Sequence, residues 1–343
     1  MGRYVGKYSR VGYPNKRELV WEATEDASAA KSRIKALYND RAPIFTMASL
    51  RELHQQLKSD LQPGQKISVR GLDGVIVEFD VEIGRVVDFR SDKPDVERVA
   101  VQLGITYISP VFLLRDPYDN HLAYSPMIIH HFTTLRHKVT KEPIEAIPSS
   151  GSDVVKAEFT EGLEQWESSK TCLDLQATVK KIKFPCGFKI DKIIAFACEL
   201  CRKRSLYQHG LIRTLRKALS NLEGCQDIRC LAQDPAYTSI DIEVLEAFEI
   251  STLDDPEGFL QIDDTTLVVS MMPDVPVKEI VADIARPAMI VWDMNPNGPI
   301  YCTDPTSSRV TEYLDKSYSK SEFPVDTDTD TFRGVAIYTR LDT

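Results

Sequence analysis

Polar residues follow several short apolar runs in the second half of the chain, where they could contact a ligand. Glu199 follows the run 192–197, Asp234 follows the run 228–232, and Asp293 follows the run 288–292. The carboxyl ends of parallel strands meet at one edge of a sheet, and such sheets bind ligands there. We therefore predict a polar, mostly acidic crevice lined by Glu199, Gln208, Gln233, Asp234, Asp293 and Asn295.

The loop after the run 192–197 lacks the glycines that hold phosphate. It reads Ala-Cys-Glu-Leu-Cys-Arg-Lys-Arg at the place where a dinucleotide-binding fold has Gly-x-Gly-x-x-Gly. Glu199 would repel a pyrophosphate, so the sequence argues against NAD or FAD, and the cofactor stays unknown. S-adenosylmethionine, which is cationic at sulfur, would tolerate the acid better. A nucleotide- or S-adenosylmethionine-dependent transferase is therefore an alternative function.

Asp234 has two interpretations. An acid at the end of the second strand of an adenosine-binding fold hydrogen-bonds the ribose. An Asp-Pro turn also ends a strand, and its aspartate can cap the helix expected to begin near Thr238. We favour the cap. Because His209 is the only histidine near these positions, no Ser/His/acid triad can form, and we predict no catalytic residue.

Cysteines are the next candidates. Cys198-x-x-Cys201 supplies two of the four ligands that zinc requires, and Cys225 with Cys230 has the wrong spacing for a second pair. We therefore predict no metal site, and the acid pairs 254–255 and 263–264 are interpreted as solvated loop residues. The 7 cysteines, in a chain without a secretion signal, indicate reduced and mostly buried thiols.

His130-His131 lies within an apolar run, so strand alternation predicts one buried ring, bonded to the backbone, and one outward ring. A redox sensor acting through the cysteine-rich half is part of a second alternative function.

The elements that must position these residues alternate between short strands and helical segments over about 192–298. Such alternation is typical of a parallel sheet with right-handed crossovers. We predict an α/β, Rossmann-like, mostly parallel sheet in the C-terminal half. The polar segment 147–153 is a linker signal, so the predicted domains are 1–150 and 151–343.

The first half predicts a smaller α+β extension of unknown role. Apolar spacing indicates a helix over 48–61, and Asp73-Gly74 indicates a hairpin within 67–89. Further strands are expected at 107–114 and 127–135, a loosely held arm over 1–30, and one helix over 161–181.

The net charge of -9 and the pI near 5.3 argue against nucleic acid as a partner. The chain has no apolar window of membrane-spanning length and no secretory signal, so we expect a cytoplasmic or nuclear protein.

Scattered positions in the second half resemble the SRR-like domain family, named after the plant protein "sensitivity to red light reduced", in its extended fungal form. They are the strand at Lys192, the helix with Gln208, Gln233-Asp234-Pro235 with Asp241 and Leu245, Leu267 running to Met272-Pro273, the helix 277–284, and Asp293-Met-Asn295. The resemblance implies a Rossmann-like, non-enzymatic regulatory or accessory protein of nucleus or cytoplasm, with protein partners and a small ligand. Relatives are linked to light and circadian signalling in plants and to haem metabolism elsewhere. The resemblance therefore adds a haem sensor, with Cys186 or His131 as the haem ligand, to the second alternative function. They tend to carry glycines and a small hydroxyl residue where this chain has Ala197, Cys198 and Glu199.

Overall fold

The computed structural model describes residues 9–11, 27–87, 94–115, 122–144, 151–198, 203–222, 224–294, 302–325 and 331–341. The chain divides into two compact units, Met1–Ser149 and Ser150–Thr343. Among the described residues, no helix has the length and apolarity needed to cross a membrane.

The N-terminal unit is α+β and its strand pairs are antiparallel, as predicted. One sheet has the order β1-β6-β5-β4, with β7 paired to β6, and β2 and β3 form a separate hairpin. The strands are β1 Ser9–Val11, β2 Lys66–Arg70, β3 Ile76–Asp80, β4 Val86–Val87, β5 Val96–Tyr107, β6 Met127–His137 and β7 Pro143–Ile144. The helices are α1 Ala27–Asn39, α2 Met47–Leu57 and α3 Pro110–Arg115.

One prediction for this unit is wrong. The strand expected at 107–114 is the end of β5 followed by α3, because Pro110 takes the first position of a helix, where a missing N–H costs nothing. Within the arm expected over 1–30, β1 pairs with β6 and α1 begins at Ala27, and residues 1–8 and 12–26 lie outside the described residues. The hairpin around Asp73-Gly74 and the helix α2 are confirmed.

His130 and His131 point to opposite faces of β6, as their alternation predicted. His130 is buried, and its Nδ1 lies 2.9 Å from the Thr106 side-chain oxygen Oγ1. His131 is the ring bonded to the main chain, because its Nε2 accepts the Glu82 N–H at 3.0 Å. Burial lowers the pKa of His131, which favours the neutral ring.

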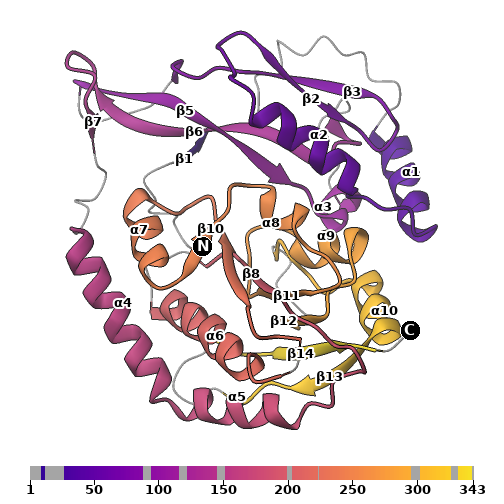
Figure 1. Ribbon diagram of the computed structural model, residues 1–343. Coiled ribbons are helices and arrows are strands. Elements are labelled where there is room, and N and C mark those ends of the chain that lie inside the picture. Colours follow the sequence, from indigo (N-terminus) through magenta and orange to yellow (C-terminus); the bar gives the residue numbers. More distant parts are fainter. Residues whose placement is uncertain are drawn as a thin grey trace. The chain divides into compact units, whose positions relative to one another are not determined.

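The C-terminal unit contains a seven-stranded sheet in the order β10-β9-β8-β11-β12-β14-β13 (Figure 1). The strands are β8 Lys192–Phe196, β9 Arg229–Gln233, β10 Ile250–Thr252, β11 Thr266–Ser270, β12 Met289–Asp293, β13 Tyr318–Glu322 and β14 Val335–Arg340. The helices are α4 Ser152–Glu167, α5 Lys170–Lys181, α6 Lys203–Leu219, α7 Ser239–Ala247, α8 Glu257–Leu260, α9 Val277–Ile284 and α10 Ser308–Ser317.

Strands β8 to β12 are parallel, and β14 and β13 add antiparallel strands at one edge. The predicted Rossmann-like, mostly parallel fold is therefore confirmed. The chain runs from β8 outward to β9 and β10, then returns past β8 to β11. The strand order thus reverses between β8 and β11, and a reversal of this kind is where open α/β sheets bind ligands.

Helices cover both faces of this sheet. Alternate residues of β8 and β11, such as Ile193 and Leu267, share a core with Phe159, Trp166 and other residues of α4, α5 and α6. The helix expected over 161–181 is two helices, because the Ser169 side chain accepts the Cys172 N–H and so starts α5. Along the other face, α10 is joined to α9 by the Arg309–Asp283 ion pair.

Candidate functional site

Two left-handed residues stand at the carboxyl edge, where the strand order reverses. Ala197 follows β8 with φ 58°, and Met272 follows β11 with φ 50°. The two strands are direct neighbours, since Phe196 pairs with Ser270. Side chains with a Cβ rarely adopt this backbone conformation. Position 197 therefore has a glycine-like backbone conformation but carries an alanine.

On the β9 side of the reversal, Gln233 holds a loop in place. Its Nε2 donates to Asp255 Oδ1 at 3.0 Å, and its Oε1 accepts the Gly258 N–H at 2.6 Å. A Cβ at position 258 would lie 2.7 Å from that oxygen, so this approach requires glycine. Gln233 is buried and connects β9 to the start of α8.

Asp234 closes a turn, as the Asp-Pro sequence predicted, but Thr238 caps the following helix, so the favoured interpretation is correct for the turn and wrong for the cap. Its Oδ1 accepts the Ala236 N–H at 2.9 Å. Thr238 is the cap of α7, with its hydroxyl accepting the Asp241 N–H and the Asp241 side chain accepting the Thr238 N–H. That reciprocal pair leaves no capping position for Asp234.

A buried chain of hydrogen-bonded polar groups connects the segments that follow β8 and β9 to the helix α6. The Tyr237 hydroxyl is 3.2 Å from both the Cys198 carbonyl oxygen and His209 Nε2, and His209 Nδ1 is 2.8 Å from the Ser205 carbonyl oxygen. Because a carbonyl only accepts, Nδ1 carries the His209 proton, and the neutral ring leaves Nε2 as an acceptor. Tyr237 has a single hydroxyl proton, which it donates to the Cys198 carbonyl oxygen or to Nε2, but not to both. Burial lowers the pKa of His209 to about 4 and raises the pKa values of Cys198 and Tyr237, so all three stay uncharged at neutral pH.

On the β12 side, Asp293 belongs to a buried ionic cluster with Lys278 and Asp304, here called the Lys278 cluster. Lys278 Nζ lies 3.3 Å from Asp293 Oδ2, 3.0 Å from Asp304 Oδ2 and 3.0 Å from the Asp304 carbonyl oxygen. The three side chains are 0%, 6% and 1% exposed for Lys278, Asp293 and Asp304. Asp293 Oδ1 also accepts the Met272 N–H at 2.8 Å, so the cluster supports the left-handed turn after β11.

The charge states in the Lys278 cluster follow from burial and proximity. Burial opposes the charge on Lys278, but Asp304 and Asp293 outweigh it and raise the pKa of the lysine. Burial raises the pKa of Asp304 to about 6, although Lys278 acts in the opposite direction. Lys278 is therefore an ammonium, and one ammonium faces two carboxyl groups.

The predicted crevice residues occupy two separate places along the carboxyl edge. Gln233 and Asp234 end β9, Asp293 ends β12, and β8 and β11 lie between them. Three strand spacings of ~4.8 Å put these ends roughly 14 Å apart. Gln208 is buried on α6. Glu199 and Asn295 lie outside the described residues, as does Cys201.

The acid pairs that were interpreted as solvated loop residues include bonded members. Asp255 accepts from Gln233, and Asp263 pairs with Lys192. Within the described part of the chain, no group of three His, Cys, Asp or Glu side chains is arranged to hold a metal ion.

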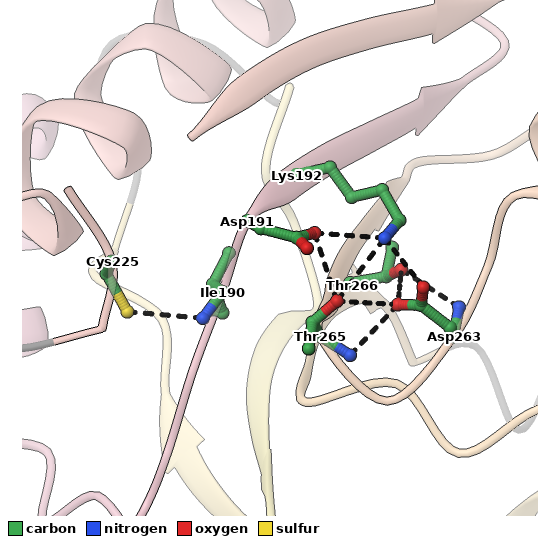
Figure 2. Close-up of polar contacts among 7 residues, drawn as sticks. All are labelled: Ile190, Asp191, Lys192, Cys225, Asp263, Thr265 and Thr266. Carbon is green, nitrogen blue, oxygen red and sulfur yellow. Dashed lines mark hydrogen bonds and ion pairs between the residues drawn. The ribbon is translucent and has the colours of Figure 1, made fainter. Parts of the chain in front are cut away.

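The opposite, amino edge of the sheet carries a second lysine cluster, here called the Lys192 cluster (Figure 2). Lys192 Nζ lies 2.9 Å from Asp191 Oδ1 and 2.8 Å from Asp263 Oδ2, and the Thr265 and Thr266 hydroxyls donate to Asp263. Nearby, the Ile190 N–H donates to Cys225 Sγ at 3.2 Å. This network joins the start of β8 to the turn before β11.

Sequence reasoning missed Lys278 and Asp304. Lys278 lies in the helix Val277–Ile284, where five of the eight residues are apolar, and a lysine in so apolar a helix was a signal that it needed a buried partner. Asp304 lies in an irregular segment, and no local pattern there distinguishes a buried aspartate from an exposed one.

Comparison with known protein families identifies the domain that contains the seven-stranded sheet. Residues 189–338 match the family model described as the SRR1 domain. The chain contains an SRR1 domain of the SRR-like family. The SRR1 domain begins just before β8 and reaches into β14, so it spans the whole parallel sheet and both sides of the candidate site. None of the curated proteins compared with the chain matches it.

Several solved structures share only a distant likeness to this chain. A protein from Corynebacterium glutamicum is 12% identical, over 57% of this chain and 94% of its own, with a TM-score of 0.32. A SAM-dependent O-methyltransferase from Thermotoga maritima is 10% identical, over 82% of this chain and 95% of its own, with a TM-score of 0.30. The N-methyltransferase NodS from Bradyrhizobium japonicum, in complex with S-adenosyl-L-homocysteine, is 9% identical, over 55% of this chain and 99% of its own, with a TM-score of 0.30. Likeness at this level carries no argument about what the SRR1 domain binds.

Proposed function

We propose that this SRR1-domain chain is a regulatory or accessory protein, without catalysis of its own, that acts in the cytoplasm or nucleus through protein partners. We further propose that it takes a small ligand where the strand order reverses. The observation that carries the ligand proposal is the pair of left-handed residues, Ala197 and Met272, at the ends of adjacent strands. A left-handed residue with a Cβ costs roughly 1–2 kcal/mol. Such strain collects at ligand-binding and switch sites.

The ligand would lie between the two groups of candidate residues. Gln233 and Asp234 would face it from the β9 side and Asp293 from the β12 side, and Glu199, Gln208 and Asn295 complete the proposed set. No catalytic role is proposed for these residues, because the described polar atoms among them bond to neighbouring loops. Nearby, burial keeps Cys198 and Tyr237 protonated, and the lowered pKa of His209 makes its neutral ring a weak base, so these residues supply no ready nucleophile or base.

A transferase using the same edge is the competing function, and a ligand screen separates the two. The purified chain would be tested by thermal shift with S-adenosylmethionine, S-adenosylhomocysteine, ATP, NAD(P)H and haemin. A ligand at about 100 times its Kd adds roughly 2.7 kcal/mol of stability. The regulatory proposal predicts that no adenosyl compound stabilises the chain through Asp234.

Asp234→Asn is the test variant, and Asp264→Asn is its matched control. Asp264 is exposed in the turn before β11, at the opposite edge of the sheet. Stabilisation by S-adenosylmethionine that persists in Asp264→Asn and disappears in Asp234→Asn would overturn the regulatory proposal in favour of the transferase. Haemin binding that is lost on replacing Cys186 or His131 would favour the haem sensor.

A further inference from the structure

The Lys278 cluster joins three segments that are distant in the sequence. Lys278 has three ammonium hydrogens and three acceptors, which are the Asp293 carboxyl, the Asp304 carboxyl and the Asp304 carbonyl. The Lys278 N–H, in the first turn of α9, donates to Asp304 Oδ1 at 3.0 Å. Asp304 therefore caps α9 from the segment 302–306, and Lys278 fastens that segment to the end of β12.

The Lys278 cluster contains more acidic groups than basic groups. One ammonium faces two carboxyl groups, so at neutral pH the buried group carries an excess negative charge. The segments that form the cluster also carry Asp274 before α9, Glu279 on α9 and Cys302 near Asp304, and none of these three can supply a positive charge. On α10, Arg309 pairs with Asp283 of α9 and Lys316 pairs with Glu312, and α10 also carries Asp315. The charges that act on Asp304 are those of Lys278 and Asp293, so the excess stays negative.

We propose that the Lys278 cluster is a proton-operated latch, which holds the segment 302–306 against α9 more tightly when the cluster takes up one proton. The proton comes from solvent and binds Asp304 Oδ2, so the hydrogen bond from Lys278 Nζ to that oxygen is lost, while Oδ1 still accepts the Lys278 N–H. Lys278 remains an ammonium and keeps the Asp293 carboxyl and the Asp304 carbonyl as partners. The buried cluster then has no excess charge, which removes the cost of burying it.

The direction of the pH effect follows from linkage. Burial raises the pKa of Asp304 to about 6 in the closed latch, whereas the ordinary value of 3.8 returns when the segment lifts into water. The closed form therefore binds the proton more tightly, and closure is favoured as pH falls through about 6. From those two values, opening should be about tenfold more frequent at pH 7 than at pH 5.

The latch also acts on the rim of the candidate ligand site. Asp293 binds Lys278 through one oxygen and the Met272 N–H through the other. Proton uptake would therefore steady the left-handed turn after β11. The latch itself requires no ligand, so its failure would leave the proposed function standing, and the reverse also holds.

Amide hydrogen exchange, resolved by residue and corrected for the intrinsic effect of pH, tests the latch on the full chain. The Lys278 N–H should be protected about tenfold more at pH 5 than at pH 7. The Thr265 N–H is a matched control, because it donates to Asp263 Oδ1 at 3.0 Å in the Lys192 cluster. The pKa of Asp263 is lowered to about 2, so the protection of Thr265 should not change over this range.

The variant Asp304→Asn tests whether the pH dependence of Lys278 N–H protection comes from Asp304 or from a change in the stability of the whole chain. Asparagine is neutral and keeps an oxygen for the Lys278 N–H, so the variant should show high, pH-independent protection of that amide. If wild-type protection of Lys278 is flat from pH 5 to pH 7, or falls toward pH 5, the latch is wrong. A wild-type pH dependence that persists unchanged in Asp304→Asn would overturn it as well.

Discussion

Lys192 and Lys278 occupy opposite edges of the same sheet, and each meets two aspartates. The Lys192 side chain is 6% exposed, but its partners Asp191 and Asp263 are 38% and 51% exposed. The partners of Lys278 are 6% and 1% exposed. Water therefore reaches the carboxylates of the Lys192 cluster and is excluded from those of the Lys278 cluster.

This difference in hydration gives the two clusters opposite responses to acid. At Asp263, burial acts toward a higher pKa, but hydrogen bonds from Lys192, Thr265 and Thr266 outweigh it and lower the pKa to about 2. At Asp304, burial dominates and raises the pKa to about 6. A lysine with two aspartates therefore has no fixed effect on how stability responds to pH, since the solvent around the carboxylates sets the direction of the aspartate pKa shift.

Replacing each lysine should give the largest difference between the two clusters in the free energy of unfolding. Lys278→Met leaves two buried carboxyl groups without their cation, so the free energy of unfolding at pH 7 should fall by about 3–5 kcal/mol. Lys192→Met leaves carboxylates that water can solvate, and the loss should be nearer ~1 kcal/mol. Urea unfolding of both variants measures the difference. Equal losses would mean that the aspartates of the two clusters are equally hydrated.

The contributions of Asp304 and Asp263 to stability should change in opposite directions as the pH falls. Asp304 has a raised pKa, so its contribution to stability is fully present below 3.8 and is lost as pH rises through about 6. From pH 5 to pH 7, wild type should therefore lose about 1.3 kcal/mol relative to Asp304→Asn. Asp263 has a lowered pKa, so its contribution is present above 3.8 and is lost as pH falls toward 2.

The matched measurement is the unfolding free energy of wild type, Asp304→Asn and Asp263→Asn across pH. Wild type and Asp263→Asn should run parallel from pH 5 to pH 7 and converge only in strong acid. If wild type instead gains stability relative to Asp304→Asn as pH rises from 5 to 7, the direction of the pKa shift proposed for Asp304 is wrong.

Salt should give the smallest effect. The coupling free energy between Lys192 and Asp263, from a double-mutant cycle, should shrink between 0.1 M and 1 M NaCl, because salt screens exposed charges. The coupling between Lys278 and Asp304 should change little, because ions cannot enter a buried cluster. If both couplings shrink alike, solvent reaches both clusters.

The sequence predicted the sheet better than the chemistry at its edge. The apolar runs at β8, β9, β11 and β12 were each placed within a residue or two, since buried parallel strands are continuous apolar segments. Positions 161–181 were harder, because Ser168-Ser169 interrupts one helical pattern with a cap that the apolar spacing does not reveal. The strand expected at 107–114 failed because an apolar run before a turn fits a short helix equally well.

The candidate site was predicted only as positions along an edge. Gln233, Asp234 and Asp293 do end strands, but the strand order separates β9 from β12, and no local pattern states that order. The interpretation of Asp234 as a helix cap failed because Thr238 has the same capping chemistry nearer the helix. The pairing of Lys278 with Asp304 depends on a tertiary contact over 26 residues, which spacing alone cannot give.

The most direct test is a carboxyl-carbon NMR titration of the chain, with Asp304 and Asp263 assigned by their asparagine variants. We predict that Asp304 titrates near pH 6 and that Asp263 titrates near pH 2. Midpoints on opposite sides of the ordinary value of 3.8 would establish that hydration sets the direction of the aspartate pKa shift in each cluster. Midpoints on the same side would contradict it.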